Sequence, residues 1–501
     1  QPQPHVGAVT GGHTKRGRGG AWVLELVGHA LDRNGAEPAR GTTGGRRRER
    51  FGAALRALLR RPSSSGYSAR VKILIIGSGG REHAIIRRLA SDTPAPELHA
   101  APGNPGIAQL ATCHDAAVTD LDAQVRLADR LQPDLVVIGP EAPLVAGAAD
   151  RLREAGHTVF GPSAAAAVLE GSKSWAKEIM AAAGVPTAAS VTVTAREQLE
   201  PGLDRINPLA DVPYVVKADG LAAGKGVVVT EDRTAAITHA VAVLTAGGSV
   251  VLEEFLDGPE VSLFCLSDGT RVVPLAPAQD FKRALDDDEG PNTGGMGAYS
   301  PLPWAPEGLA EEVLEKVARP TIAELASRGI PFVGVLYCGL ALTSRGMRVI
   351  EFNARFGDPE TQVVLERLAS PLAPLLLDAA RGELTAETDL AWSEDSAVTV
   401  VLASAGYPAA ARSGDPITGI DAAEQLGAHV IHAGTATMDG ALVSAGGRVL
   451  SVVATGEDLE AARSRALSAT EAIRLEGSHH RTDIARRAAA DAQAASEEMN
   501  A

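Results

Sequence analysis

The stretch VKILIIGSGGREHAIIRRLA, residues 71–90, indicates how the first folded part of the chain is built. It begins with an apolar run of strand length, continues through a glycine cluster, and then repeats apolar residues at helical spacing. The same order returns around DLVVIGP, residues 134–140, and HTVFGPS, residues 157–163. Repeated strand and helix units are typical of a parallel sheet with helices on its faces. We therefore expect such a sheet here.

The glycine turn at residues 77–80 has the features of an anion site. Backbone N–H groups at a helix N-terminus, together with the helix dipole, favour a phosphate by roughly 0.3–1 kcal/mol. A dinucleotide fingerprint would need a third glycine, and Glu82 stands at that position. The residues therefore argue against a nicotinamide-dependent oxidoreductase. A phosphate site and a plain tight turn both stay open.

The segments after residue 170 predict further strands and helices, including an antiparallel strand pair. Residues 171–184 open a helix that ends at Gly184, and strands at 214–220, 226–230 and 249–256 alternate with helices and turns. After a helix near 309–326, the runs 332–343 and 348–357 predict an antiparallel strand pair. Strands at 397–406, 429–434 and 448–456 precede a helix through 457–474. The expected fold class is α/β and α+β multidomain, with a small mixed β domain at the end.

Length and composition limit the possible functions. A chain of 501 residues is expected to form roughly two to four cores. The net charge of −15 argues against nucleic acid as a partner. No apolar run approaches the ~18 residues of a membrane span, so we expect a soluble protein without a membrane partner. Three distant cysteines predict neither a disulfide framework nor a zinc site, and they fit the cytoplasm.

Residues 1–70 differ from the rest of the chain in composition. They carry 13 Lys and Arg against 4 Asp and Glu, with Gly- and Arg-rich stretches too poor in apolar periodicity to form a core. A transit peptide, a basic RNA-binding arm and an upstream start that is not translated are three interpretations. No methionine precedes Met180, and a GTG codon at Val71 would be read as a start. We therefore expect the working polypeptide to begin at residue 71.

A glycine-rich loop at residues 219–226 resembles a phosphate-binding loop without matching one. It has three residues between Gly220 and the Gly224-Lys225 pair, where a Walker A loop has four, and Gly226 stands where Ser or Thr should follow. The loop also joins two strands. We interpret it as a flap that folds over a triphosphate, with Lys217 beneath it, and a plain hairpin turn is the alternative.

Polar residues near position 351 predict a metal site. Glu351 and Asn353 are two apart on a strand, so both side chains point to the same face. A carboxylate and an amide oxygen suit Mg²⁺, which completes its shell with water and nucleotide phosphates. Arg355 follows on that face, and residues 357–360 turn into a helix. A surface strand with ordinary polar residues is the alternative.

The segment 280–301 is rich in glycine, proline and acid. We expect residues 286–289, with three aspartates and a glutamate, to form a solvated loop, because their spacing is not that of a calcium loop. The glycines of residues 294–297 let the backbone approach a small ligand. His479 and His480 lack partners at metal-ligand spacing and are expected at the surface.

Eight motifs together resemble one family. GSGGREHA, APGNPG, GPEAPL, LEGSK, KADGLAAGKGV, EEFLDGPE, PNTGGMGAYSP and EFNARFGDPETQ occur in the order found in glycinamide ribonucleotide synthetases, which are ATP-grasp ligases of purine biosynthesis. The resemblance runs from Val71 to about residue 490. It implies that glycine and 5-phosphoribosylamine are joined through glycyl phosphate, with ATP as substrate, Mg²⁺ or Mn²⁺ as the metal, and a monomeric enzyme.

The resemblance also implies roles for individual residues. It places the nucleotide at Lys173, Lys217, Gly220, Gly224, Lys225, Gly226, Glu253, Glu254, Leu256 and Glu260. It places phosphoribosylamine at Gly79, Gly80, Arg81, Asn104, Glu141, Arg355 and Asp358. It places glycine and the γ-phosphate at Asp280, Lys282, Arg283, Asn292, Thr293, Gly294, Gly295 and Gly297. Asp280, Lys282, Arg283 and Arg355 are the expected catalytic residues, and Glu351 and Asn353 the expected metal ligands.

The family's domain plan gives the expected boundaries. They are a basic leader over 1–70, an N-terminal preATP-grasp domain over 71–172, an ATP-grasp domain over 173–392 with a flap lobe at about 190–257, a β-rich domain over 393–490 and a tail over 491–501. Phe281, Leu285 and Glu289 depart from the residues usual in the family. Another ATP-grasp ligase is the nearest alternative, and a nonenzymatic nucleotide-binding protein would require the loss of residues that are present here.

Overall fold

The stretch at residues 71–90 forms strand β1 (Lys72–Gly77) and helix α3 (Gly80–Ala90). The computed structural model describes residues 70–221, 226–385 and 388–500, so the basic leader lies outside the described residues. β1 is the middle strand of a five-stranded parallel sheet in the order β3-β2-β1-β4-β5. The other strands are β2 (Glu97–Pro102), β3 (Thr112–Cys113), β4 (Leu135–Ile138) and β5 (Val159–Phe160).

Short helices connect these strands. They are η1 (Ile107–Gln109), α4 (Leu121–Leu131), α5 (Glu141–Val145), α6 (Ala148–Glu154) and α7 (Ala164–Gly171). Nearly every residue of β1 and β4 is buried, because helices cover both faces of a parallel sheet, and their sequences are therefore continuous apolar runs. The prediction of a parallel sheet with covering helices is confirmed.

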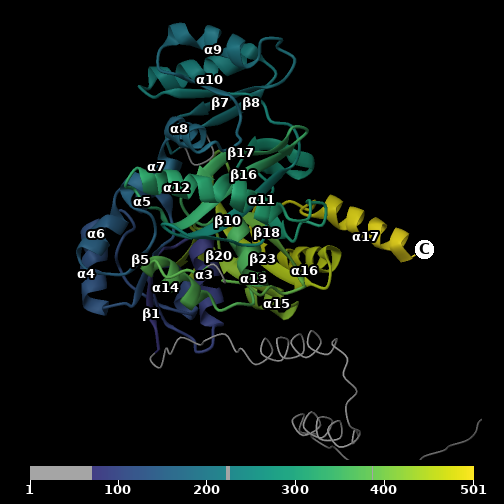
Figure 1. The fold of residues 1–501 in the computed structure, drawn as a ribbon. Helices are drawn as coiled ribbons and strands as arrows, with labels where there is room; N and C mark the ends of the chain where they lie inside the picture. Colours follow the sequence, from purple (N-terminus) through teal and green to yellow (C-terminus); the bar gives the residue numbers. More distant parts are fainter. Residues whose placement is uncertain (1–69, 222–225, 386–387, 501) are drawn as a thin grey trace, which may run out of the picture. The chain divides into compact units, whose positions relative to one another are not determined.

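A small antiparallel sheet follows helix α8 (Lys173–Ala183), which ends at Gly184 as predicted. Its order is β6-β9-β7-β8, with β6 (Ser190–Val193), β7 (Tyr214–Ala218), β8 (Val227–Thr230) and β9 (Val250–Glu253). The connecting helices are η2 (Arg196–Gln198), α9 (Leu199–Ile206) and α10 (Arg233–Thr245). Helices α9 and α10 cover one face of the sheet (Figure 1), and they share a separate small core with Val216 and Leu252.

The central sheet carries the predicted antiparallel pair. Its order is β11-β10-β16-β17, with β10 (Glu260–Asp268), β11 (Val272–Pro274), β16 (Val333–Thr343) and β17 (Gly346–Asn353). The register pairs Tyr337 with Asn353 and Gly339 with Glu351. Helices of this region are α11 (Leu309–Val313), the π-helical turn η4 (Leu314–Ala318), α12 (Arg319–Ser327), α13 (Glu360–Arg367) and α14 (Leu372–Arg381).

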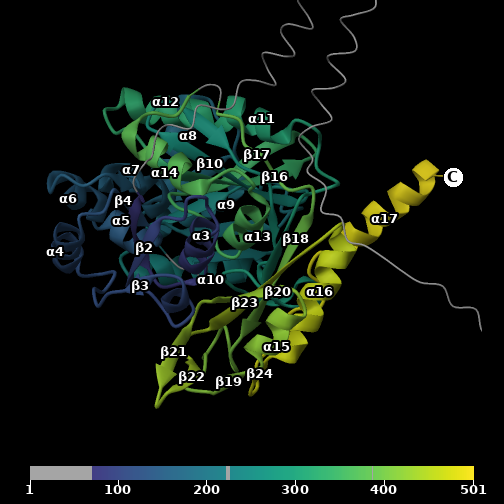
Figure 2. The ribbon, with the colours of Figure 1, turned by 90° about the horizontal axis from the view of Figure 1, so that it is seen from below.

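The last sheet draws on two distant parts of the sequence. Its order is β12-β15-β18-β23-β20, with β12 (Gln279–Asp280), β15 (Gly297–Ser300), β18 (Ser396–Ala403), β20 (Ala428–His432) and β23 (Arg448–Gly456). Helices α15 (Ile420–Gln425) and α16 (Leu459–Ala472) lie beside it (Figure 2). The predicted C-terminal strands and helix are confirmed, whereas β12 and β15 join them from the glycine-rich segment.

Smaller elements complete the chain. They are β13 (Arg283–Leu285), η3 (Asp286–Asp288), β14 (Glu289–Asn292), β19 (Ile417–Thr418), β21 (Thr435–Met438), β22 (Ala441–Ser444), β24 (Arg474–Leu475) and α17 (Arg486–Asn500). Leu74 of the parallel sheet, Val261 of the central sheet and Val398 of the last sheet belong to one continuous hydrophobic core. Within the described part of the chain, no helix is long and apolar enough to cross a membrane.

Candidate active site

A cavity of about 1390 Å³ collects most of the residues singled out in the sequence. Those on its wall are Arg81, Glu141, Lys173, Lys217, Gly220, Gly226, Glu253, Glu254, Leu256, Glu260, Asp280, Lys282, Arg283, Asn292, Thr293, Gly294, Glu351, Asn353, Arg355 and Asp358. They come from helices that cover the parallel sheet, from strands of the other three major sheets, and from the loops between them. Gly224 and Lys225 lie outside the described residues. The cavity is therefore assembled by tertiary structure from motifs spread over most of the folded chain.

The beginning of the glycine flap is anchored to the N-terminus of α8. The Asp219 carboxylate accepts hydrogen bonds from the Lys173 backbone amide (2.6 Å) and the Ser172 hydroxyl (3.1 Å). Although burial acts in the opposite direction, hydrogen bonds from Ser174 and the helix amides hold the pKa of Asp219 below its usual range. The Lys173 ammonium donates to the Gly220 carbonyl at 2.9 Å. The flap and this lysine are thus held together at one end of the cavity.

Two lysines share one carboxylate on the cavity wall at the end of β9. Glu253 Oε2 lies 3.0 Å from Lys217 Nζ and 3.3 Å from Lys177 Nζ. The Lys217 ammonium also donates to the Ile350 carbonyl at 3.2 Å. Burial lowers the pKa of Lys177, and the positive charge of Lys217 acts in the same direction, whereas Glu253 opposes it. Two ammonium groups with one carboxylate leave an excess positive charge, which suits nucleotide phosphates.

The edge of the cavity nearest β9 carries the remaining nucleotide candidates. Glu254 forms an ion pair with Arg345 at 2.6 Å and accepts the Ala189 amide at 3.2 Å. Leu256 lies on the wall, and Glu260 pairs with the Lys282 ammonium. The Glu260 carboxylate is therefore engaged within the protein.

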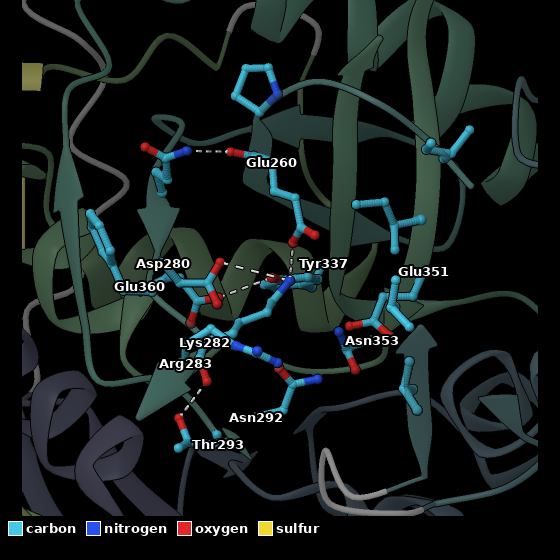
Figure 3. Close-up of a pocket in the computed structure, with 18 of the residues that line it drawn as sticks. Glu260, Asp280, Lys282, Arg283, Asn292, Thr293, Tyr337, Glu351, Asn353 and Glu360 are labelled. Atoms are coloured by element: carbon cyan, nitrogen blue, oxygen red, sulfur yellow. Dashed lines mark hydrogen bonds and ion pairs between the residues drawn. The ribbon is translucent and has the colours of Figure 1, made fainter. Parts of the chain in front are cut away.

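Glu351 and Asn353 project from β17 toward the interior of the cavity (Figure 3). Burial would raise the pKa of the Glu351 carboxyl, but the positive charges of Lys282, Lys217 and Lys173 outweigh it and hold the pKa below its usual range. An ionised carboxylate beside an amide oxygen fits Mg²⁺ or Mn²⁺ as a partial shell. Among the described residues, no group of three or more His, Cys, Asp or Glu is arranged to hold a metal. Ligands from phosphate and water would have to complete the shell.

Lys282 lies in the middle of the site, with Glu260, Asp280 and Glu360 toward one side of it (Figure 3). Its ammonium is 4.0 Å from Asp280 Oδ1. Burial disfavours the charged lysine, but Asp280 and Glu260 outweigh this effect and hold the pKa of Lys282 well above its usual value. Burial, with the negative charges of Glu360 and Glu260, raises the pKa of Asp280 to about 7. The Tyr337 hydroxyl donates to Glu360 at 3.0 Å.

A second group of charges surrounds Arg355 at the opposite end. Its guanidinium pairs with Glu170 at 2.9 Å and with Glu141 at 3.5 Å. Glu170 also accepts the Ala354 amide at 2.7 Å, which fixes the backbone beside the arginine. Arg81 donates to the Gly139 carbonyl at 3.2 Å. Two arginines with firm supports are a suitable site for an anionic sugar phosphate.

The predicted glycine-turn residues Gly79 and Gly80 do not line the cavity. The Glu82 side chain occupies the turn instead. The Glu82 carboxylate accepts the Gly79 amide at 2.5 Å, and burial raises its pKa. A Cβ at Gly139 would come within 2.1 Å of Glu82 Oε1, so the neighbouring strand end needs glycine. The Glu82 side chain thus packs against Gly77 and Gly139, at the position where a dinucleotide fingerprint has its third glycine.

Three further predicted residues are engaged in the fold rather than on the cavity wall. The Asn104 side chain donates to the Ser78 and His432 carbonyls and accepts the Gly106 and Ile107 amides. Gly295 has a φ of 112° and lies against Pro359, and Gly297 lies against Ile484. These contacts within the protein are enough to explain why asparagine and glycine stand at these three positions, and no bound ligand is needed for the explanation.

Several residues of the site were not singled out in the sequence. They are Glu170, Lys177, Tyr337, Glu360 and Arg448. Lys177 had a local signal, because it stands one helical turn after Lys173 on α8. Arg448 had none: it reaches from β23 to the Gly294 and Asp358 carbonyls, both at 2.6 Å.

Comparison with known proteins assigns the chain to a family. Family models described as the N, ATP-grasp (A) and C domains of phosphoribosylglycinamide synthetase match residues 71–170, 171–361 and 397–487. A phosphoribosylamine–glycine ligase of Streptomyces coelicolor is 60% identical over 422 residues, covering 84% of this chain and 100% of that protein. The Mycobacterium tuberculosis ligase of the same name is 54% identical over 421 residues, covering 84% and 99%.

Solved structures agree with these matches. The crystal structure of phosphoribosylamine–glycine ligase from Thermotoga maritima is similar with a TM-score of 0.71 and 35% identity, covering 83% of this chain and 100% of that one. A biotin carboxylase domain from Hydrogenobacter thermophilus has a TM-score of 0.60 at 18% identity, covering 82% and 91%, and shares the fold. Because the family models cover most of the chain in order, the protein belongs to the phosphoribosylglycinamide synthetase family.

Proposed function

We propose that the protein is an ATP-dependent ligase that joins glycine to 5-phosphoribosylamine in purine biosynthesis, giving glycinamide ribonucleotide, ADP and phosphate. The observation that carries this function is the single cavity that gathers the residues of all the family motifs other than APGNPG, in a chain that covers the whole length of a 60% identical ligase. The cavity offers three separate cations, Lys217, Lys282 and Arg355, each held in place by carboxylates. Three such groups suit a triphosphate, a small carboxylate and a sugar phosphate.

The reaction proceeds in two balanced steps. A glycine carboxylate oxygen attacks the γ-phosphorus of ATP, the bond to the β-phosphate oxygen breaks, and ADP leaves. The amine of 5-phosphoribosylamine then attacks the acyl carbon of glycyl phosphate, loses a proton, and displaces inorganic phosphate. Placement of the reactants and neutralisation of charge supply most of the acceleration in phosphoryl transfer.

Each region of the cavity has a role in this scheme. Lys173 and Lys217 hold the nucleotide phosphates under the loop from Gly220 to Gly226, and Glu253, Glu254 and Leu256 line the adenine region, with Glu260 toward the ribose. Glu351 and Asn353 hold Mg²⁺ or Mn²⁺, which supplies charge neutralisation for the phosphates.

The two acceptors occupy the remaining walls. Lys282 and Arg283, with Asp280 and the backbone of residues 292–294, orient glycine toward the γ-phosphate. Phosphoribosylamine is oriented by Arg81, Glu141, Arg355 and Asp358. The glycine turn and Asn104 support this end of the cavity without lining it. We further propose a monomer in the cytoplasm, a location that suits the free thiols of Cys113, Cys265 and Cys338 in the described part of the chain.

One experiment tests the activity and the order of the steps together. Purified protein should form ADP only when ATP, glycine and phosphoribosylamine are all present. Oxygen-18 in the glycine carboxylate should appear in inorganic phosphate, because the oxygen that bridges to phosphorus leaves with it. Another amine acceptor that replaces phosphoribosylamine with equal efficiency would favour a different carboxylate–amine ligase. Product formation without label in phosphate would refute the acyl phosphate.

A further inference from the structure

The acidic run at residues 286–288 is tied to a short segment near the C-terminal end. The Asp286 carboxylate accepts the Thr482 backbone amide at 2.8 Å. The Asp287 backbone amide donates to Asp483 at 2.9 Å, and the Asp288 carboxylate pairs with Arg481 at 2.8 Å. Asp287 and Asp288 are exposed, as expected of a solvated loop, but each of the three aspartates also has a specific partner.

Arg481 is the centre of this contact. Its side chain is 1% exposed. Nε and Nη2 donate to the two oxygens of Asp483 at 2.8 and 2.7 Å, so the pair is bidentate. Nη1 donates to Asp288 at 2.8 Å and to the backbone carbonyl of Arg283 at 3.2 Å. The guanidinium carbon lies 4.9 Å from the centre of the Phe281 ring, which adds a cation–π contact.

The residues that Arg481 holds flank the candidate glycine site. Phe281 and Arg283 stand on either side of Lys282, which lies in the middle of the cavity (Figure 3). The Arg283 guanidinium donates in turn to the Asp288 carbonyl at 3.1 Å and to Asn292 at 3.3 Å. A single buried guanidinium therefore contacts the Phe281 ring before Lys282 and the Arg283 carbonyl after it, although it does not itself line the cavity.

Geometry favours arginine over lysine at this position. A planar guanidinium can serve a bidentate carboxylate on one edge and two oxygens on another, whereas an ammonium is a point donor on a flexible stem. Arg481 uses one edge of its guanidinium for Asp483, another for Asp288, and the flat face for the Phe281 ring. Replacement by lysine keeps the charge but removes the geometry.

We propose that Arg481 is a positioning residue for glycine activation: it fixes the segment that carries Lys282 and Arg283 so that the glycine carboxylate meets the γ-phosphate of ATP. The proposal rests on the ligase function proposed above. It assigns to Arg481, a side chain that does not touch substrate, a role in the proposed glycine site. The nucleotide end depends on Lys173 and Lys217, which other elements support.

Arg481→Lys in the full chain tests the proposal by steady-state kinetics with each substrate varied in turn. We expect kcat/KM for glycine to fall on the order of 10²-fold, because a shift of about 1 Å in reacting groups has that effect. The KM for ATP should stay within about twofold, since the nucleotide lysines keep their supports. Hydrogen exchange of the ligand-free protein should become faster over residues 281–293. Equal losses for glycine and ATP, or an unchanged glycine KM in a folded variant, would overturn the proposal.

Two further variants separate positioning from stability. Asp288→Ala removes one partner of Arg481 at a position that is 68% exposed, so it should fold even if Arg481→Lys does not, and it should raise the glycine KM about tenfold. Arg367→Lys is the matched control: this buried arginine bonds the Ser300 hydroxyl and the Asp395 carbonyl, away from the cavity wall. It should lower stability without a selective effect on glycine. Inactive wild-type protein would refute the ligase function itself, whereas active wild type with a normal Asp288→Ala would refute only the role of Arg481.

Discussion

Glu253 shows how single side chains set the charge of the cavity. One buried carboxylate lies between Lys177 and Lys217, so it offsets part of the positive charge that the two lysines bring to this wall of the cavity. The sequence identified Lys217 because a glycine loop follows it, but Glu253 was assigned to the adenine site from its motif alone. Its ion pairs add a second role, the support of both lysines.

At the same scale, the metal ligands give a direct prediction. Glu351→Ala and Asn353→Ala should each lower kcat on the order of 10²-fold at limiting Mg²⁺, because each removes an oxygen proposed to hold the metal that would neutralise the phosphates. Rates measured over a range of Mg²⁺ concentrations check this, and higher Mg²⁺ should recover part of the loss. Circular dichroism should remain unchanged, since a half-buried strand position accepts alanine. Near-normal turnover at low Mg²⁺ would show that the metal is held elsewhere.

Arg355 gives a prediction about substrate selectivity. Arg355→Ala removes the cation between Glu141 and Glu170, so that end of the cavity becomes negative and should repel a sugar phosphate. We expect the KM for phosphoribosylamine to rise tenfold or more, with a smaller change for glycine. Initial rates with each substrate varied separately measure both. A defect confined to glycine would contradict the assignment of this end.

How well the sequence predicts a residue depends on how local its signal is. Glu351 and Asn353 follow from strand periodicity, and their placement on one cavity agrees with it. The roles of Arg448 and Arg481 are visible only after folding, because the partners that tie them to the glycine-rich segment, Gly294 and Asp288, lie more than a hundred positions away along the chain. Asn104 shows the converse problem, that a family motif can suggest a ligand role for a residue whose side chain is engaged by backbone groups of the fold.

At the scale of elements, local patterns predict strands and helices better than they predict partners. The pair β16 and β17 was expected because a short turn joins two apolar runs. The strands β12 and β15 were not, because they are short, and β15 pairs with β18, which begins at Ser396 almost a hundred positions later. Pairing over such a distance leaves no periodic trace in either segment.

The contact between α3 and β20 predicts a dependence of stability on pH. His83 Nδ1 accepts the His432 backbone amide at 2.8 Å, so this nitrogen must be unprotonated. Burial, aided by the nearby His432, lowers the pKa of His83 to about 3, and burial lowers that of His432 to about 4. Both folded values lie below the ordinary value of 6.5.

The sign of the effect follows from proton uptake. Between about pH 6.5 and 4 the unfolded chain binds more protons than the folded one, so stability is complete above this window and falls as the pH is lowered. His83→Gln should make the decline shallower by about one proton, while costing about 1 kcal/mol at pH 7 through the weakened hydrogen bond. Urea unfolding at pH 7, 6 and 5 measures both. An unchanged slope would mean that His83 does not contribute.

At the scale of the whole molecule, the core closes over the C-terminal segment. Ile484, Ala488 and Ala489 are buried in the continuous core, whereas the side chains from Gln493 to Glu498 are exposed. Deletion of residues 492–501 should therefore leave activity and thermal stability close to those of the full chain. Deletion of residues 479–501 should abolish glycine-dependent ADP formation, because Arg481 and four core side chains are lost. Thermal melting and ADP assays of both truncations check this, and an active shorter protein would contradict it.

The pairing of β15 with β18 also affects the order in which the site can form while the protein is being translated. Translation delivers the lysines of the nucleotide region first, then β15, and only much later β18 and Arg481. A nascent chain that stops early can thus possess the lysines of the proposed nucleotide region while the segment around Lys282 still lacks its support. Such a fragment would hold only part of the proposed site, so we expect prematurely terminated chains to be inactive as ligases.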